Sequence, residues 1–98
     1  MKQLIVRPEA EEDIRATREV LEQAQTGLGR RFVGQVREVL ERIESTPELY
    51  GFALWDVRAA RVKRFRYVIY YTVFEDRVEV IAVLHGARDP SVWQARSQ

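Results

Sequence analysis

Residues 61–84 have the sequence RVKRFRYVIYYTVFEDRVEVIAVL, and this stretch decides the fold class. It is rich in Val, Ile, Tyr, Phe and Thr, the residue types that favour β-strands. Glu75 and Asp76 interrupt it as a tight connection. We therefore expect three antiparallel strands in a meander, over residues 61–65, 67–74 and 77–84.

The last of these strands predicts which face of the sheet is buried. Successive side chains of a strand point to opposite faces. On this pattern one side carries Val78, Val80, Ala82 and Leu84, and the other carries Arg77, Glu79, Ile81 and Val83. We expect the first side to form the core and the second to be mixed.

Two amphipathic helices are predicted upstream of the sheet. Pro8 ends a short strand over residues 4–6 and suits the first turn of a helix, where the carboxylates of residues 9–13 are also favoured. Apolar or small residues then recur at spacings of three and four, first as Ala10, Ile14, Thr17, Leu21 and Ala24, then as Phe32, Val36, Val39, Leu40 and Ile43. The break at residues 26–29 and the stop at Pro47 predict an antiparallel helical hairpin that runs to about residue 25 and back.

The remaining segments complete an α+β domain. Residues 47–57 follow neither period, and we expect an ordered, partly packed loop. Asp89 and Pro90 are typical of a helix start, which predicts a short turn carrying Trp93 and Arg96. The expected architecture is one domain over residues 1–98, with the helical hairpin on one face of a mainly antiparallel four-stranded sheet and the carboxy-terminal turn near the other.

Composition limits the chemistry. The chain has 98 residues, of which 46% are hydrophobic and 32% charged, no cysteine and a single histidine, His85. Disulfides, cysteine nucleophiles and histidine-rich metal clusters are thereby excluded. We expect no metal and no cofactor. The first residues do not resemble a signal peptide, and no window is apolar enough to span a membrane, so we expect a cytoplasmic protein with no membrane partner.

The densest charge feature is a basic cluster. It comprises Arg58, Arg61, Lys63, Arg64 and Arg66, with no acidic residue between Asp56 and Glu75, although the formal net charge of the whole chain is only +1. Such cations beside aromatic residues suit a nucleic-acid surface. The residues alone favour a plainer interpretation, in which the charges protect an edge strand from aggregation.

A second cluster follows the last strand, where His85, Gly86, Arg88 and Asp89 lie close together in sequence. A titratable base, a glycine and a cation at one sheet end suit proton transfer near a phosphate. The alternative is local: His85 forms a nearby hydrogen bond, Arg88 pairs with Asp89, and Trp93 packs on the second face of the sheet. Tyr67, Tyr70 and Tyr71 are likewise more typical of strand packing than of base stacking.

The order of elements and the segment Leu84-His85-Gly86-Ala87-Arg88-Asp89-Pro90 resemble the RelE/ParE toxin superfamily along essentially the whole chain. The acid-rich start of the first helix and the end of the second are also similar. The resemblance implies the toxin of a type II toxin–antitoxin pair, neutralised by a cognate antitoxin that wraps around it. Members resembling RelE cleave messenger RNA in the ribosome, whereas members resembling ParE inhibit DNA gyrase.

The nuclease pattern is incomplete in this chain. Val68 stands where RelE-like nucleases have a strand arginine, Arg88 matches their terminal arginine, and Trp93 falls near a catalytic tyrosine. Arg66, two residues before Val68, would share its strand face. The resemblance therefore implies gyrase inhibition without catalysis, with a target-binding surface made of Arg61, Lys63, Arg64, Arg66, Arg88 and Trp93.

Two alternatives remain open. One is a metal-independent messenger RNA endonuclease that acts on the ribosome, with Arg66, His85 and Arg88 as catalytic residues. The other is a non-toxic binding module with the same fold.

Overall fold

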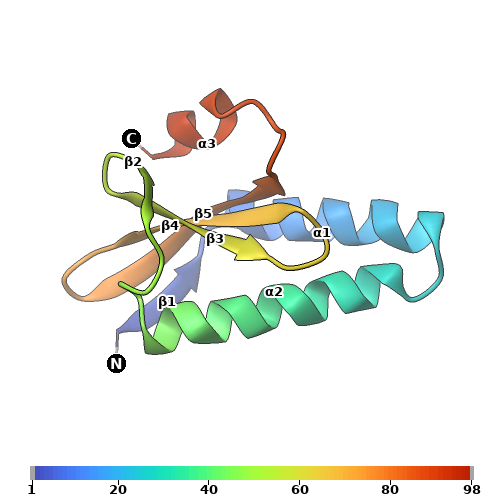
Figure 1. The fold of residues 1–98 in the computed structure, drawn as a ribbon, viewed down its shortest axis with the longest axis horizontal. Helices are drawn as coiled ribbons and strands as arrows, with labels where there is room; N and C mark the ends of the chain where they lie inside the picture. The colour runs from blue at the N-terminus through green and yellow to red at the C-terminus, as the bar shows by residue number, and fades with distance from the viewer. Residues whose placement is uncertain (1, 98) are drawn as a thin grey trace.

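The protein forms three layers, with two long helices on one face of a sheet and a short helix on the other (Figure 1). The computed structural model describes residues 2–97. Its elements are β1 (Gln3–Val6), α1 (Pro8–Ala24), α2 (Leu28–Ser45), β2 (Phe52–Leu54), β3 (Val57–Val62), β4 (Tyr67–Val73), β5 (Arg77–His85) and α3 (Ser91–Arg96). This confirms the predicted α+β order of strand, helical hairpin and meander. No helix in the described range is long and apolar enough to cross a bilayer.

The sheet has five strands in the order β1-β5-β4-β3-β2, one more than expected. β1 pairs with β5 in parallel, and the other pairs are antiparallel. The extra strand, β2, lies in the segment expected to be a loop. It turns into β3 through Trp55 and Asp56, and Trp55 has a left-handed φ of 51°. A three-residue strand joined by a turn without Asn-Gly or Asp-Gly lacks the usual sequence signal of a hairpin.

The predicted strand over residues 61–65 is wrong, because β3 ends at Val62 and residues 63–66 form the turn into β4. Arg64 and Arg66 adopt left-handed φ angles of 75° and 59°, which lets the chain reverse before Tyr67 pairs with Val62. Phe65 is a residue type typical of strands, which led to the wrong prediction. In the structure its ring packs on the Phe32 ring, with centroids 5.4 Å apart. Arg66 therefore does not share a strand face with Val68.

A β-bulge at Ile81 changes the faces of β5. Tyr70 pairs with Ala82 and Tyr71 with Val80, so Ile81 has no partner on β4. The extra residue reverses the alternation beyond it. Val83 consequently joins Val78 and Val80 in the core under the helices, whereas Ile81, Ala82 and Leu84 face α3. The expected alternation was wrong from Ala82 onward, because it assumed an unbroken strand.

The larger core lies between the helical hairpin and the sheet. Its buried α2 residues are Phe32, Val36, Val39 and Ile43, which confirms the predicted stripe of that helix. The stripe of α1 is less complete, because only Ala10 is buried and Ala24 is exposed. Both helices run beyond the ends of the strands in Figure 1, so the last turn of α1 has no sheet to cover.

The smaller core lies under α3. Trp93 is 5% exposed and stacks on Tyr70, with ring centroids 4.7 Å apart. Asp89 Oδ1 accepts a hydrogen bond from the Ser91 N–H at 2.9 Å, which confirms the predicted helix start. Arg96, in the last turn, donates to Asp13 Oδ2 at 2.7 Å. α3 is thus held by ring stacking near its start and by an ion pair near its end.

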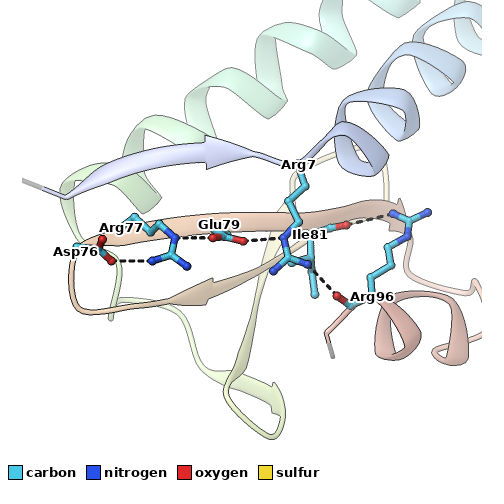
Figure 2. A network of polar contacts seen from close by, with 6 residues as sticks. All are labelled: Arg7, Asp76, Arg77, Glu79, Ile81 and Arg96. Atoms are coloured by element: carbon cyan, nitrogen blue, oxygen red, sulfur yellow. Dashed lines mark hydrogen bonds and ion pairs between the residues drawn. The ribbon is translucent and has the colours of Figure 1, made fainter.

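A chain of polar contacts joins both ends of the protein to β5 (Figure 2). Glu79 accepts from Arg77 and from Arg7 Nε, the latter at 2.7 Å, and Arg7 also donates to the Arg96 carbonyl at 2.9 Å. Arg96 in turn donates to the Ile81 carbonyl at 3.2 Å. These bonds satisfy backbone groups where β1 no longer pairs with β5, and they fix α3 to the sheet.

The helical hairpin depends on one carboxylate and two glycines. Glu22, near the end of α1, accepts from the N–H groups of Gly27 at 2.8 Å and Gly29 at 3.0 Å. These bonds, chiefly that of Gly27, hold the pKa of the Glu22 carboxyl below its usual range. A Cβ atom at Gly29 would lie 2.5 Å from the Arg18 carbonyl oxygen, so α1 and α2 approach this closely only because the position is glycine.

Replacing Gly29 with Ala should destabilise the protein by about 1–3 kcal/mol, because the backbones of α1 and α2 must separate. Gly34→Ala is the matched control: it lies in the same helix, a Cβ there meets nothing within 4 Å, and we expect a gain of about 0.5–1 kcal/mol. Urea denaturation measures both. Equal stability of the two variants would contradict the close packing of the hairpin.

Glu79→Gln should lower the unfolding free energy by about 1–2 kcal/mol at neutral pH. Arg77 and then Arg7 hold the pKa of Glu79 below its ordinary value of 4.5. A lowered folded-state pKa stabilises the protein above that ordinary value, and this stability is lost as pH falls through the folded pKa. The difference between wild type and variant, measured by denaturation from neutral to acid pH, should therefore shrink in acid. Glu41→Gln, at an exposed position without an ion pair within residues 2–97, is the control and should change the unfolding free energy at neutral pH by no more than about 0.5 kcal/mol.

Candidate functional site

A basic cleft of about 740 Å³ lies between the β3–β4 turn and the loop after β5. Its walls are formed by Arg61, Val62, Lys63, Arg64, Arg66, Tyr67, Val68, His85, Gly86 and Ala87. Arg61, Lys63, Arg64 and Arg66, four of the residues predicted to bind a target, meet here with His85. We call these ten residues the basic cleft.

The two walls of the basic cleft are tied together by backbone. Gly86 N–H donates to the Arg66 carbonyl at 2.8 Å. A Cβ atom at Gly86 would lie 3.3 Å from that oxygen, tighter than ordinary contact, so a glycine suits this approach. On the other wall, the left-handed conformations of Arg64 and Arg66 cost of order 1–3 kcal/mol each. The packing of Phe65 on Phe32 holds the turn in place despite that cost.

The basic cleft has no internal counter-ion. None of its lining residues is acidic, and within residues 2–97 its four cations form no ion pair and no side-chain hydrogen bond. Other arginines of the chain are paired with carboxylates, namely Arg7, Arg15, Arg77 and Arg96. Unpaired charges of one sign on the walls of a cleft attract ligands of the opposite sign. The cleft is therefore suited to an anion.

Arg58, the fifth member of the sequence cluster, has a structural role. Its guanidinium donates to the carbonyls of Tyr50 at 2.7 Å and Glu48 at 3.3 Å. It also lies over the Phe52 ring, 4.0 Å from the centroid. Arg58 thus fixes the segment before β2 and does not line the cleft.

His85 is exposed at the end of β5, and two contacts restrict the orientation of its imidazole ring. Its Nδ1 accepts a hydrogen bond from the Ala87 N–H at 3.0 Å, and its ring meets Tyr67 edge to face at 5.4 Å. The neutral ring therefore has its proton on Nε2. Because Nδ1 is already bonded, a proton can reach it only by displacing that bond. His85 is better placed to donate a hydrogen bond than to act as a base.

The remaining predicted residues lie outside the cleft. Arg88 is exposed in the loop after β5 and does not line the basic cleft. Asp89 accepts a hydrogen bond from the Ser91 N–H and does not form the ion pair with Arg88 that the sequence suggested. Trp93 is buried on Tyr70, which leaves little of its surface for a target. Of the three nuclease candidates, Arg66 and His85 share the cleft and Arg88 does not.

The three strand tyrosines pack within the protein. Tyr67 contacts Phe32 edge to face at 5.1 Å, in addition to His85, and Tyr70 stacks on Trp93. Tyr71 is buried and its hydroxyl donates to the Pro47 carbonyl at 2.6 Å; burial raises the pKa of Tyr71 to about 12. Tyr67 and Gly86 were not predicted as site residues, because their place beside the basic turn follows from strand pairing alone.

Comparison with known proteins decides the family. The family model described as the ParE toxin of the type II toxin–antitoxin system parDE matches residues 4–90. The chain belongs to the ParE toxin family. This confirms the resemblance drawn from its sequence. No curated protein matches the sequence of this ParE-family chain.

Solved structures share the fold of this ParE-family chain. A chromosomal ParDE toxin–antitoxin system from P. aeruginosa matches with a TM-score of 0.65 at 13% identity, over 87% of this chain and 96% of that one. A YoeB dimer from Staphylococcus aureus matches with a TM-score of 0.60 at 17% identity, over 86% and 95%. A YoeB–YefM complex from the same organism gives 0.58 at 17% identity, over 87% and 97%. At these identities the likeness concerns the fold.

Nitrogen NMR should find neutral His85 protonated at Nε2, because Nδ1 accepts the Ala87 N–H. The chain has one histidine, so long-range proton–nitrogen correlations at mildly alkaline pH report on it without ambiguity. A proton on Nδ1 in the neutral ring would contradict the hydrogen bond and restore His85 as a candidate base.

Proposed function

We propose that this ParE-family chain is a toxin that inhibits growth by binding DNA gyrase, without catalysis, and that a cognate antitoxin neutralises it. The observation behind the proposal is the basic cleft, which gathers four unpaired cations but offers no free proton acceptor from His85. Such a site can hold an anionic surface, and its one histidine has no free ring nitrogen to serve as a general base for cleaving it.

Phosphodiester cleavage needs a base within reach of the attacking hydroxyl and cations around the developing charge, all in one site. Here Val68 occupies the strand position of the nuclease arginine, Arg66 lies in a turn, and Arg88 lies outside the basic cleft. The second candidate function, ribosome-dependent RNA cleavage, rests on the presence of Arg66 and His85 in the same cleft. It is weaker because that pair lacks both a third cationic partner on β4 and a free base.

Two observations support an antitoxin partner. The similar structures include a ParDE toxin–antitoxin system and a YoeB–YefM complex. In addition, the segment around β2 exposes large apolar side chains, with Leu49 60%, Phe52 61% and Trp55 57% exposed. An apolar patch of this kind is typical of a surface that a protein partner covers.

A supercoiling assay with purified gyrase tests the proposal. The wild-type chain should inhibit supercoiling and leave broken DNA, and Arg64→Glu should lose about tenfold or more in potency, equivalent to about 1.4 kcal/mol of binding. Arg37→Glu is the matched control, because Arg37 is an exposed arginine of α2 without an ion pair within residues 2–97. It should retain potency to within about twofold, the scatter expected of surface charges that touch no partner.

A ribosome-loaded messenger RNA assay with the same preparation separates the alternatives. Intact RNA is expected alongside gyrase inhibition. Codon-periodic cuts with normal supercoiling would overturn the proposal, and loss of those cuts in a folded His85→Ala variant would then make His85 catalytic. No effect in either assay would favour a binding module of another kind.

A further inference from the structure

We propose that the basic cleft binds the phosphodiester backbone of duplex DNA. The toxin would then contact both its target enzyme and the DNA bound to that enzyme. The contact with the enzyme rests on the proposed function. The DNA site is a property of this chain alone and can be measured without any partner.

The charge of the basic cleft is local. The whole chain has a formal net charge of only +1, yet Arg61, Lys63, Arg64 and Arg66 line one cleft without an acidic neighbour in its walls. Three of the four are arginines, whose guanidinium groups match the oxygens of a phosphate in two parallel hydrogen bonds. A bound anion would reduce the repulsion among these cations.

The lining also indicates which part of a nucleic acid is recognised. Its polar side chains are donors, apart from the hydroxyl of Tyr67, and so match the acceptor oxygens that phosphates present at every nucleotide. No carboxylate or amide is present to read a base. The site therefore suits the backbone of any sequence.

Single strands are disfavoured because the aromatic side chains here are already engaged. Proteins that bind single-stranded nucleic acid stack the bases on the free faces of aromatic side chains. Tyr67 makes edge contacts with Phe32 and His85, and Phe65 packs on Phe32. With these rings committed to packing, phosphate contacts remain, and a duplex presents its phosphates closely spaced on the outside.

Fluorescence anisotropy tests this with the purified full chain and a labelled duplex of about 20 base pairs, with no gyrase present. Four phosphate contacts predict that affinity falls roughly 100-fold between about 50 and 200 mM salt. Arg64→Gln should reduce the salt slope by about one, because it removes one cation and keeps the side-chain stem. Arg37→Gln, the matched control, should leave the slope unchanged, and circular dichroism checks that both variants are folded.

Three results would each overturn the inference: duplex binding that ignores salt, equal binding by the two variants, or tighter binding to single-stranded RNA or poly-glutamate than to the duplex. The last would assign the cleft to RNA or to an acidic protein surface. The proposed function fails separately. Duplex binding without gyrase inhibition refutes gyrase as the target and leaves the DNA site standing, whereas gyrase inhibition without duplex binding refutes the DNA site alone.

Discussion

The bulge at Ile81 is the constraint on which the rest of the structure depends. In a regular β5, Val78, Val80, Ala82 and Leu84 would all lie on one face of the sheet, and the helical hairpin would have to cover them. The extra residue divides the strand, so that Val80 and Val83 pack in the core under the helical hairpin while Ala82 and Leu84 pack under α3. The protein thereby gains two small cores from one strand. The bulge also sets the register in which His85 faces Tyr67 across the sheet, beside the basic turn.

Arginines in this chain differ in whether the protein itself binds their guanidinium groups. Where Glu79 or Asp13 is within reach, Arg7, Arg77 and Arg96 tie the two ends of the protein to β5. On the β3–β4 turn no such neighbour exists, and the cations remain available to a ligand. Arg7, Arg77 and Arg96 thus keep the sheet edge and α3 in place. Arg64 and Arg66 lie on a turn that Phe65 fixes by packing on Phe32, and Arg61 lies beside it near the end of β3.

Sequence periodicity predicted the elements whose burial is regular. The α2 stripe of Phe32, Val36, Val39 and Ile43 follows from it. The start of α1 followed from Pro8 and the carboxylates after it, and the strands after the helices followed from their residue types. The bulge, the β2 hairpin and the turn at residues 63–66 did not follow from periodicity, because each depends on which residues pair across strands. The two turns depend in addition on left-handed conformations at Trp55, Arg64 and Arg66. The site shows the same limit: the sequence identified its cations but predicted a strand over residues 61–65, whereas Lys63, Arg64 and Arg66 lie on a turn and only Arg61 lies on a strand.

The parallel pairing of β1 with β5 sets the order in which the protein can be assembled. Gln3 lies beside Arg77 and Val6 beside Val80, so the first strand to leave the ribosome must wait for the last. Contacts so distant in sequence form late and slowly. Gly86, whose N–H bonds to the Arg66 carbonyl and so ties the loop after β5 to the β3–β4 turn, is synthesised later still. A nascent chain can complete its helical hairpin early, but it cannot close its cleft until translation has passed that glycine.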